Sequence, residues 1–155
     1  VDMTILSAED ELILAMAEDV ETMTDIEEPS LRKARFGKAK ALSRKGSGDE
    51  AMEIYRALSG NKGDIVGAES AYIVISHHFD KGEHEQAEKL VYELADSKTP
   101  HSYYLGKAFI LLGDIYAAKS DTFQARATYQ SIVDGYTPVD DGVVDEAKER
   151  IQKLL

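Results

Sequence analysis

The chain has 155 residues, of which 43% are hydrophobic, so it can bury the core of one domain. Its formal net charge is −11, from 29 acidic and 18 basic residues, which argues against nucleic acid as a partner. The absence of cysteine excludes disulfides and thiolate catalysis, and no apolar run approaches the ~18 residues of a membrane-spanning segment.

Helices are expected along the whole chain, because helix-forming residues dominate between its three prolines. Alternating runs of Val, Ile and Thr, which would indicate strands, are missing. In chain order we expect a single helix, three helix pairs and a last single helix, over residues 8–24, 31–60, 66–96, 101–136 and 141–155. The predicted fold class is therefore all-α.

Residues that can cap helices support these boundaries. A Ser, Thr or Asp side chain before a helix can accept a hydrogen bond from a free backbone N–H of the first turn. The expected caps, in chain order, are Ser7 or Asp10, Ser47 with Glu50 as a capping box, Asp64, Thr99 before Pro100, Asp121 with Gln124, and Asp141. The last helix is expected to cover the end of the fold with the apolar stripe of Val144, Ala147, Ile151 and Leu154.

One pattern recurs through the middle of the chain, in residues 36–58, 72–94 and 110–132. Each segment has a helical stretch, a break, an alanine five residues after the break, and large apolar residues at +4 and +7 from that alanine. The breaks are Gly46, Gly82 and Ser120, the alanines Ala51, Ala87 and Ala125, and the large residues Tyr55, Leu58, Val91, Leu94, Tyr129 and Ile132. The alanines recur at intervals of 36 and 38 residues, and Ala17 lies 34 residues before the first. The pattern predicts helix pairs that approach closely at the alanines.

This pattern resembles the tetratricopeptide repeat (TPR) family. The third segment matches its consensus through Gly113, Tyr116, Ser120, Ala125 and Tyr129, and the first through Ala39, Leu42, Gly46, Ala51 and Tyr55. The second departs from it, with Ile75 in the slot for a small residue and Val91 in the slot for an aromatic one. The resemblance implies an α-solenoid in one domain over residues 1–155: a right-handed superhelix of antiparallel helix pairs, with about three TPR-like units and two flanking helices.

Three of the four histidines lie in the stretch SHHFDKGEHE, residues 76–85, which is either a metal site or a turn between helices. Zinc needs three or four converging ligands, and the adjacent His77 and His78 point about 100° apart on a helix. We therefore expect a turn at Gly82, with His77 and His78 late in one helix and His84 at the start of the next. Motifs for nucleotide binding, serine hydrolysis and metalloprotease chemistry are missing, so we expect no enzyme, catalytic residue, cofactor or metal.

The TPR resemblance also implies a binding groove on the concave side, lined by set positions of the first helix of each unit. The residues that this predicts to bind a partner are Lys33, Phe36, Lys40, Arg44, Tyr72, Ser76, Phe79, Lys107 and Asp114. Aromatic side chains beside cations are typical of peptide-binding sites. The alternative is that Phe36, Tyr72 and Phe79 pack against neighbouring helices, and the sequence leaves both interpretations open.

Charge is uneven along the chain. Residues 32–45 hold seven basic residues, whereas the first 28 residues hold acidic residues and no basic one. The basic segment is either a site for an acidic partner or the neighbour that the acidic N-terminal helix neutralises. The second explanation is favoured, because helices that follow one another in the chain usually lie side by side.

The expected function is non-catalytic protein–protein interaction, as a scaffold that holds a partner peptide or protein in the concave groove. The alternative is a structural segment of a longer solenoid whose ends stack on further repeats, with self-association through those ends. The units look most like bacterial multi-repeat TPR proteins, including those of the cell envelope. No signal peptide is recognisable after Val1, so the periplasm or cell envelope is preferred over the cytoplasm only if such a segment has been removed.

Overall fold

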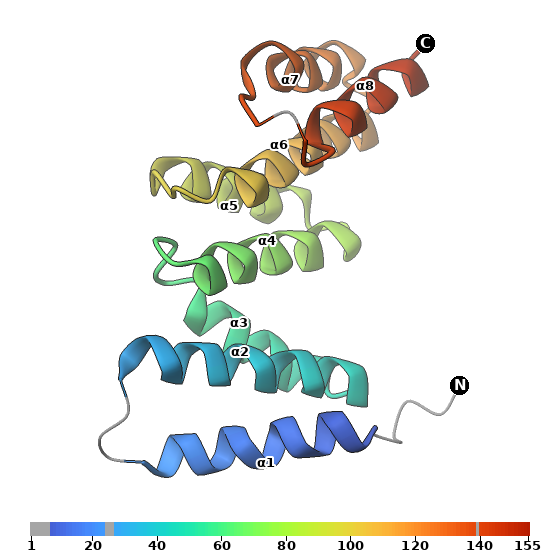
Figure 1. The fold of residues 1–155 in the computed structure, drawn as a ribbon. Coiled ribbons are helices and arrows are strands. Elements are labelled where there is room, and N and C mark those ends of the chain that lie inside the picture. The colour runs from blue at the N-terminus through green and yellow to red at the C-terminus, as the bar shows by residue number, and fades with distance from the viewer. Residues whose placement is uncertain (1–6, 24–26, 139) are drawn as a thin grey trace.

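The computed structural model describes residues 7–23, 27–138 and 140–155, and these residues form an all-α fold without strands (Figure 1). The predicted fold class is confirmed at that level. The eight helices of this part of the chain are α1 (Ala8–Thr22), α2 (Glu28–Lys45), α3 (Gly48–Leu58), α4 (Ile65–Asp80), α5 (His84–Asp96), α6 (Ser102–Ala118), α7 (Thr122–Gly135) and α8 (Val143–Lys153). They begin and end within three residues of the expected ranges; residue 24, the expected end of the first helix, lies outside the described residues.

The helices are stacked along one direction, from α1 at one end to α7 and α8 at the other (Figure 1). Each helix packs against the next one in the chain. The even-numbered helices also pack on one another, α2 on α4, α4 on α6 and α6 on α8, whereas no two odd-numbered helices do so among the described residues. The even helices therefore form one continuous layer, and the odd helices stand apart from one another.

The three breaks in the repeated pattern share one backbone geometry. Gly46, Gly82 and Ser120 have φ values of 96°, 76° and 63°, the left-handed conformation that commonly ends a helix. At each break the N–H of the following residue donates a 2.9 Å hydrogen bond to a carbonyl five residues back. The predicted breaks are confirmed, and each one turns the chain from an even helix into an odd one.

Replacing Ser120 with glycine is expected to raise the free energy of unfolding by about 0.5–1 kcal/mol, because serine is strained at a positive φ that glycine adopts freely. Glycine already occupies the equivalent positions 46 and 82. Ala118→Gly is the matched control, since Ala118 is exposed in ordinary helical backbone, and it should lower the free energy of unfolding by a similar amount. Urea denaturation measures both values, and a destabilised Ser120→Gly protein would contradict the strain argument.

The alanines expected between paired helices are buried. Ala51, Ala87 and Ala125 have no exposed surface, and Ala17 exposes only 2%. Because an alanine side chain is so short, the neighbouring helix can approach closely at these points, and larger residues one and two turns later fill the space beside it. Tyr55, Val91 and Tyr129 are among these buried larger residues.

Packing within a helix pair explains why Ile75 and Val91 can depart from the TPR consensus in the second segment. Ile75 on α4 and Val91 on α5 lie in one buried cluster. A Cβ atom built on Gly113 of α6 would lie 2.2 Å from Cε1 of Tyr129 on α7, so these two residues are in direct contact. Each pair combines a larger residue with a smaller one, which keeps the filled volume similar. The second pair has its larger residue on the first helix, and both of its residues are buried in the same cluster.

Side-chain caps close three of the expected helix starts, at Ser7, Asp64 and Asp121. Ser47 stands at the N-cap of α3 but makes no side-chain bond there. Its backbone (φ −93°, ψ 56°) differs from the extended backbone of Ser7 (φ −67°, ψ 158°), where the serine hydroxyl does accept from the first turn. The prediction of Thr99 as the cap of α6 is wrong: His101 holds that position, and Thr99 Oγ1 accepts a bond from the His101 N–H at 3.3 Å.

Candidate functional site

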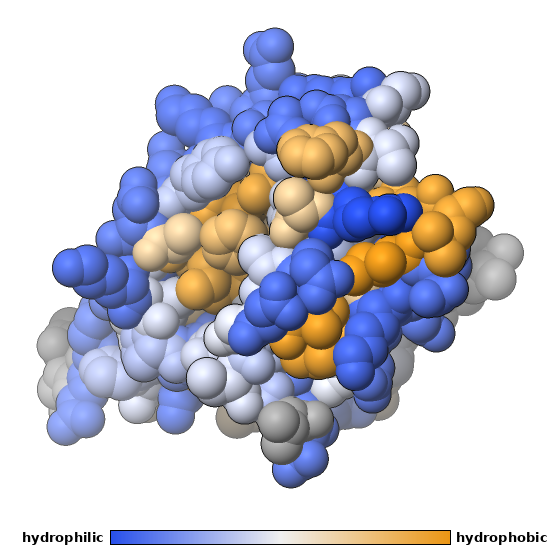
Figure 2. Space-filling model, turned by 90° about the horizontal axis from the view of Figure 1, so that it is seen from above, coloured by the Kyte–Doolittle hydropathy of each residue, from blue (hydrophilic) through white to orange (hydrophobic). Residues whose placement is uncertain are grey.

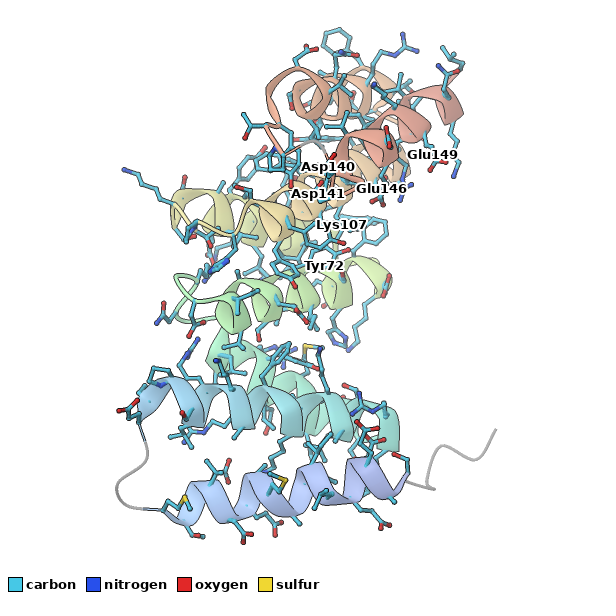
Figure 3. All side chains as sticks on the ribbon, viewed as in Figure 1. Tyr72, Lys107, Asp140, Asp141, Glu146 and Glu149 are labelled. Carbon is cyan, nitrogen blue, oxygen red and sulfur yellow. The ribbon has the colours of Figure 1, made fainter. Side chains whose placement is uncertain are left out.

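The layer of even helices carries the surface on which the sequence predicts a groove. We call this surface the even face; its polar and aromatic residues are Lys40, Glu69, Tyr72, Tyr103, Tyr104, Lys107, Asp114, Glu146 and Arg150. Lys40 Nζ on α2 lies 3.5 Å from Glu69 Oε2 on α4, and Tyr104 OH on α6 donates to the same carboxylate. Lys107 Nζ on α6 lies 2.7 Å from Glu146 Oε2 on α8 (Figure 3). Polar side chains therefore join each even helix to the next.

Asp114 connects three helices at the far end of the even face. Its Oδ1 accepts a 3.0 Å hydrogen bond from Nε of Arg150 on α8 and a short one from the hydroxyl of Tyr129 on α7. Burial and the bond to Asp114 raise the pKa of Tyr129. The carboxylate is thus committed to the packing of α6, α7 and α8, and its predicted role in binding a partner stays a prediction.

Three of the four predicted cations of the groove, Lys40, Arg44 and Lys107, are paired with acids of the same chain. Lys40 and Lys107 make the pairs described above, and Lys40 Nζ also lies 4.7 Å from the centroid of the Phe36 ring. Burial by itself lowers the pKa of Lys107, but its hydrogen bond to Glu146 contributes to a net rise. Arg44 Nε lies 2.7 Å from Asp10 Oδ1 on α1 and holds the pKa of that carboxyl below its usual range. Lys40, Arg44 and Lys107 can therefore meet a partner only by breaking an internal pair.

Lys33 lies apart from the other predicted residues. It is exposed and lines a hollow of about 220 Å³ between α2 and α1, beside Met16 and Val20. Arg44 points in the same direction, because its partner Asp10 belongs to α1. The structure therefore separates Lys33 and Arg44, at the α1 end of the stack, from Tyr72 and Lys107, which lie near one another where α4, α6 and α8 meet (Figure 3).

The predicted aromatic residues pack against neighbouring side chains. Phe36 meets Tyr55 edge to face with ring centroids 5.8 Å apart, and Phe79 lies 5.7 Å from the His84 ring beside the Gly82 turn. Both are partly buried, which favours the packing interpretation for these two rings. Ser76 on α4 is partly buried as well.

Sequence reasoning missed two tyrosines at the centre of the even face. Tyr103 is 41% exposed, and its ring centroid lies 5.2 Å from that of Tyr104, which in turn lies 6.4 Å from that of Tyr72. We call Tyr72, Tyr103 and Tyr104 the tyrosine cluster. Tyr103 and Tyr104 lie four and three residues before Lys107, a spacing that puts all three on one helix face and could have revealed them.

The basic segment 32–45 is largely neutralised inside the chain. Arg35 Nε and Lys38 Nζ lie 3.8 and 3.7 Å from the Glu21 carboxylate on α1, and Arg44 pairs with Asp10 on the same helix. Arg32 pairs with Asp64, and Lys40 with Glu69. These pairs agree with neutralisation by neighbouring helices rather than with a free basic patch.

The histidine-rich stretch forms the turn between α4 and α5, as predicted. His77 and His78 end α4, Gly82 turns the chain, and His84 begins α5. His78 Nδ1 lies 3.1 Å from Glu83 Oε1. Burial lowers the pKa of His77. Within the described residues, no three His, Asp or Glu side chains come close enough together to hold a metal ion.

No helix in the described part of the chain combines the length and the apolar character needed to cross a membrane. Comparison of the chain with protein-family models, with curated proteins and with solved structures found no match.

Proposed function

We propose that the chain is a TPR-like α-solenoid, a right-handed superhelix of about three units with α1 and α8 as flanking helices. We further propose that it is a non-catalytic scaffold for protein–protein interaction. The left-handed helix ends, the buried alanines and the layered helix pairs support the solenoid. In such a stack the closely packed layer is the inner one, which makes the even face the concave side. A partner peptide or protein binds there.

The observation that carries this proposal is the tyrosine cluster. Tyrosine offers a large amphipathic contact surface at a small cost in conformational entropy, and aromatic residues are enriched in binding hot spots. The hydroxyl of Tyr104 is fixed by Glu69, whose other oxygen meets Lys40. Because these groups are already held in place by other helices, a partner loses little free energy in ordering them.

Charge around the tyrosine cluster favours a partner segment that carries basic residues. Asp140, Asp141, Glu146 and Glu149 lie on the same side as Lys107 (Figure 3), whose ammonium group is neutralised by Glu146. The chain as a whole has a net charge of −11. Charge complementarity speeds the encounter and fixes the orientation of a partner, so we expect the bound segment to place a cation next to these carboxylates.

Tyr103→Ala is expected to weaken partner binding at least about tenfold, the usual loss at an aromatic hot spot. Phe123 is the matched control, because it is 84% exposed on the odd helix α7. Affinity capture from native cell extract compares wild type, Tyr103→Ala and Phe123→Ala, and circular dichroism confirms their helix content. A partner that is lost with Phe123→Ala and kept with Tyr103→Ala would contradict the placement on the even face.

The second candidate function is a structural segment of a longer solenoid. Its support is apolar surface at both ends of the stack: Leu12 and Met16 on α1 and Met23 just after it are 56–59% exposed, and Leu155 after α8 is 79% exposed. Figure 2 looks down on the end formed by α7 and α8 and shows apolar patches between charged side chains. Light scattering of the purified chain tests this function. Self-association that increases with concentration would favour it, provided that affinity capture finds no partner. For either function, the TPR resemblance leads us to propose that the chain belongs to a bacterial protein of the cell envelope.

A further inference from the structure

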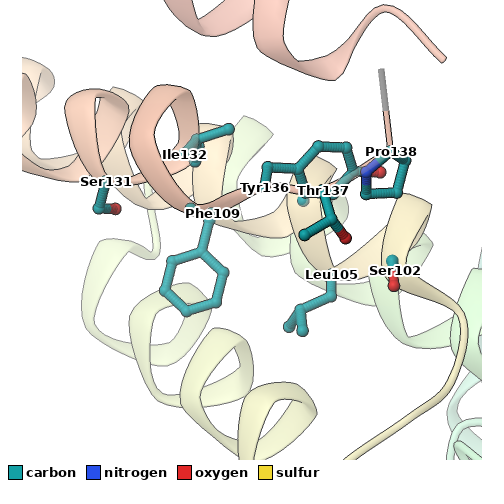
Figure 4. Close-up of a pocket in the computed structure, with 10 residues that line it drawn as sticks. Ser102, Leu105, Phe109, Ser131, Ile132, Tyr136, Thr137 and Pro138 are labelled. Atoms are coloured by element: carbon teal, nitrogen blue, oxygen red, sulfur yellow. The ribbon is translucent and has the colours of Figure 1, made fainter. Parts of the chain in front are cut away.

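A second surface lies on α6 between the odd helices α5 and α7. Two adjoining hollows of about 340 and 280 Å³ follow α6 there, and they share Phe109 and Ser131. Figure 4 shows the first of them. The floor consists of Leu105, Phe109, Leu112 and Tyr116 of α6, with Tyr92 of α5 and Ser131 of α7 at the edges. We call this surface the α6 groove. It exists because α5 and α7 both pack on α6 but not on one another.

None of the described residues that line the α6 groove carries a charge. Charged residues make up 30% of the chain, so an uncharged surface of this length is unusual for it. Apart from hydroxyls and the Gln124 amide, the lining is apolar. An ionised side chain that a bound segment brought into the groove would lose hydration without meeting an opposite charge among the described lining residues, which weakens binding.

The corresponding hollow between α1 and α3 is built in the opposite way. It measures about 270 Å³ and is lined by charged residues, including Glu21, Arg35 and Lys38. In the repeat register Arg35 and Lys38 of α2 occupy the places of Phe109 and Leu112 of α6. Their ion pairs with Glu21 cross that hollow, at 3.8 and 3.7 Å. The same position between odd helices is therefore bridged by charges in one unit and open, apolar and uncharged in another.

We propose that the α6 groove docks an apolar, uncharged segment of a partner protein, separately from the even face. The two hollows are centred about seven residues apart on α6, which corresponds to about 10 Å. A helical segment would reach both with apolar anchors seven residues apart, and an extended one with anchors three residues apart. The Thr137 hydroxyl and the Ser131 Oγ, whose own O–H donates to the Thr128 carbonyl, lie at the edge, where their oxygens can accept from N–H groups of the bound backbone.

The test selects peptides from a random display library of twelve-residue sequences on the wild-type chain, and measures their affinity by fluorescence anisotropy. Ser131→Glu places a charge at the edge of the groove where the two hollows join, and the position is exposed, so the fold is retained. Thr122→Glu adds the same charge on the same helix outside the groove. We expect uncharged peptides with apolar anchors at one of the two spacings, bound about tenfold or more weakly by Ser131→Glu and equally well by Thr122→Glu.

The salt dependence of peptide binding and the Tyr103→Ala variant distinguish this proposal from the function proposed for the even face. Binding in the α6 groove should change little between about 0.05 M and about 0.5 M salt, because no ion pair contributes. It should also be unaffected by Tyr103→Ala. Selected peptides that are basic, salt-sensitive and indifferent to Ser131→Glu would overturn the α6 groove proposal while leaving the even face intact. A selection that enriches no peptide dependent on Ser131 would overturn it as well.

Discussion

Arg32→Met is expected to lower the free energy of unfolding by about 2 kcal/mol, because it removes the donors to two carbonyls and to a carboxylate that solvent partly screens. Arg32 is only 9% exposed. Its Nε and Nη2 donate to the two oxygens of Asp64 at 2.6 and 3.0 Å, and Nη2 also donates to the carbonyls of Leu58 and Asn61. Methionine fills a similar volume but leaves the carboxylate and both carbonyls without these donors. Urea denaturation at neutral pH measures the loss.

The effect of Arg32→Met reaches beyond one contact, because Asp64 also caps α4. Its Oδ1 accepts a 2.7 Å hydrogen bond from the N–H of Gly67. The Arg32 guanidinium therefore ties α2 to the end of α3 and to the start of α4 at one point. Lys33→Met, at the next and exposed position, is the control and should change the free energy of unfolding by less than about 0.5 kcal/mol. Equal losses in the two variants would show that Arg32 has no special role.

The pH dependence of this pair gives a second readout of the Arg32→Met prediction. The hydrogen bonds from Arg32 hold the pKa of Asp64 below its usual range. A carboxyl whose pKa is lower in the folded chain stabilises it above the unfolded pKa of about 4, and this contribution is lost as pH falls through the folded value. The difference between wild type and Arg32→Met should therefore narrow as the pH is lowered from 5 toward 2, to an extent limited by the partial exposure of Asp64. A difference that stays constant would mean that the ion pair contributes nothing.

The double variant Gly113→Ile/Tyr129→Val is expected to be much more stable than the two single variants predict. Gly113→Ile alone drives a branched side chain into the Tyr129 ring and should cost about 3 kcal/mol, the upper range for overpacking. Tyr129→Val alone empties a buried site and removes the bond to Asp114, at a cost of about 3 kcal/mol. Together they reproduce the Ile75 and Val91 pair of the second unit, in which both residues are buried.

A double-mutant cycle in urea tests this exchange, and we expect a coupling of about 2–3 kcal/mol in favour of the double variant. Val20→Ala on α1, at the other end of the stack, is the control and should combine additively with either change. If Gly113→Ile does not fold, Gly113→Ala gives a milder clash with the same ring. Additive costs for the Gly113 and Tyr129 changes would show that the two positions do not share one packing volume.

The helices and their ends were predictable from the sequence alone, because the forces that set them act within a few residues. After a left-handed residue such as Gly46 or Gly82, the N–H of the next residue closes the helix with a hydrogen bond to a carbonyl five residues before it. Asp64 caps α4 by accepting a hydrogen bond from an N–H three residues ahead. The alanine spacing indicated the paired helices for a similar reason, since positions four and seven apart share one helix face. Thr99 shows the limit of such local reasoning, because the bond it makes to His101 lies before α6 and not within it.

The tertiary structure alone decided the character of the surfaces. Lys40, Arg44 and Lys107 were predicted to bind a partner, yet each pairs with an acid of another helix, 29 to 39 residues away in sequence. Such pairs depend on how the helices cross, which no local pattern specifies. Ile75 appeared to be a poor match to the small residue of the TPR consensus only because it was considered without Val91. Residues of both helices together fill the core between α4 and α5. The uncharged α6 groove arises in the same way, from the separation of α5 and α7 above one helix.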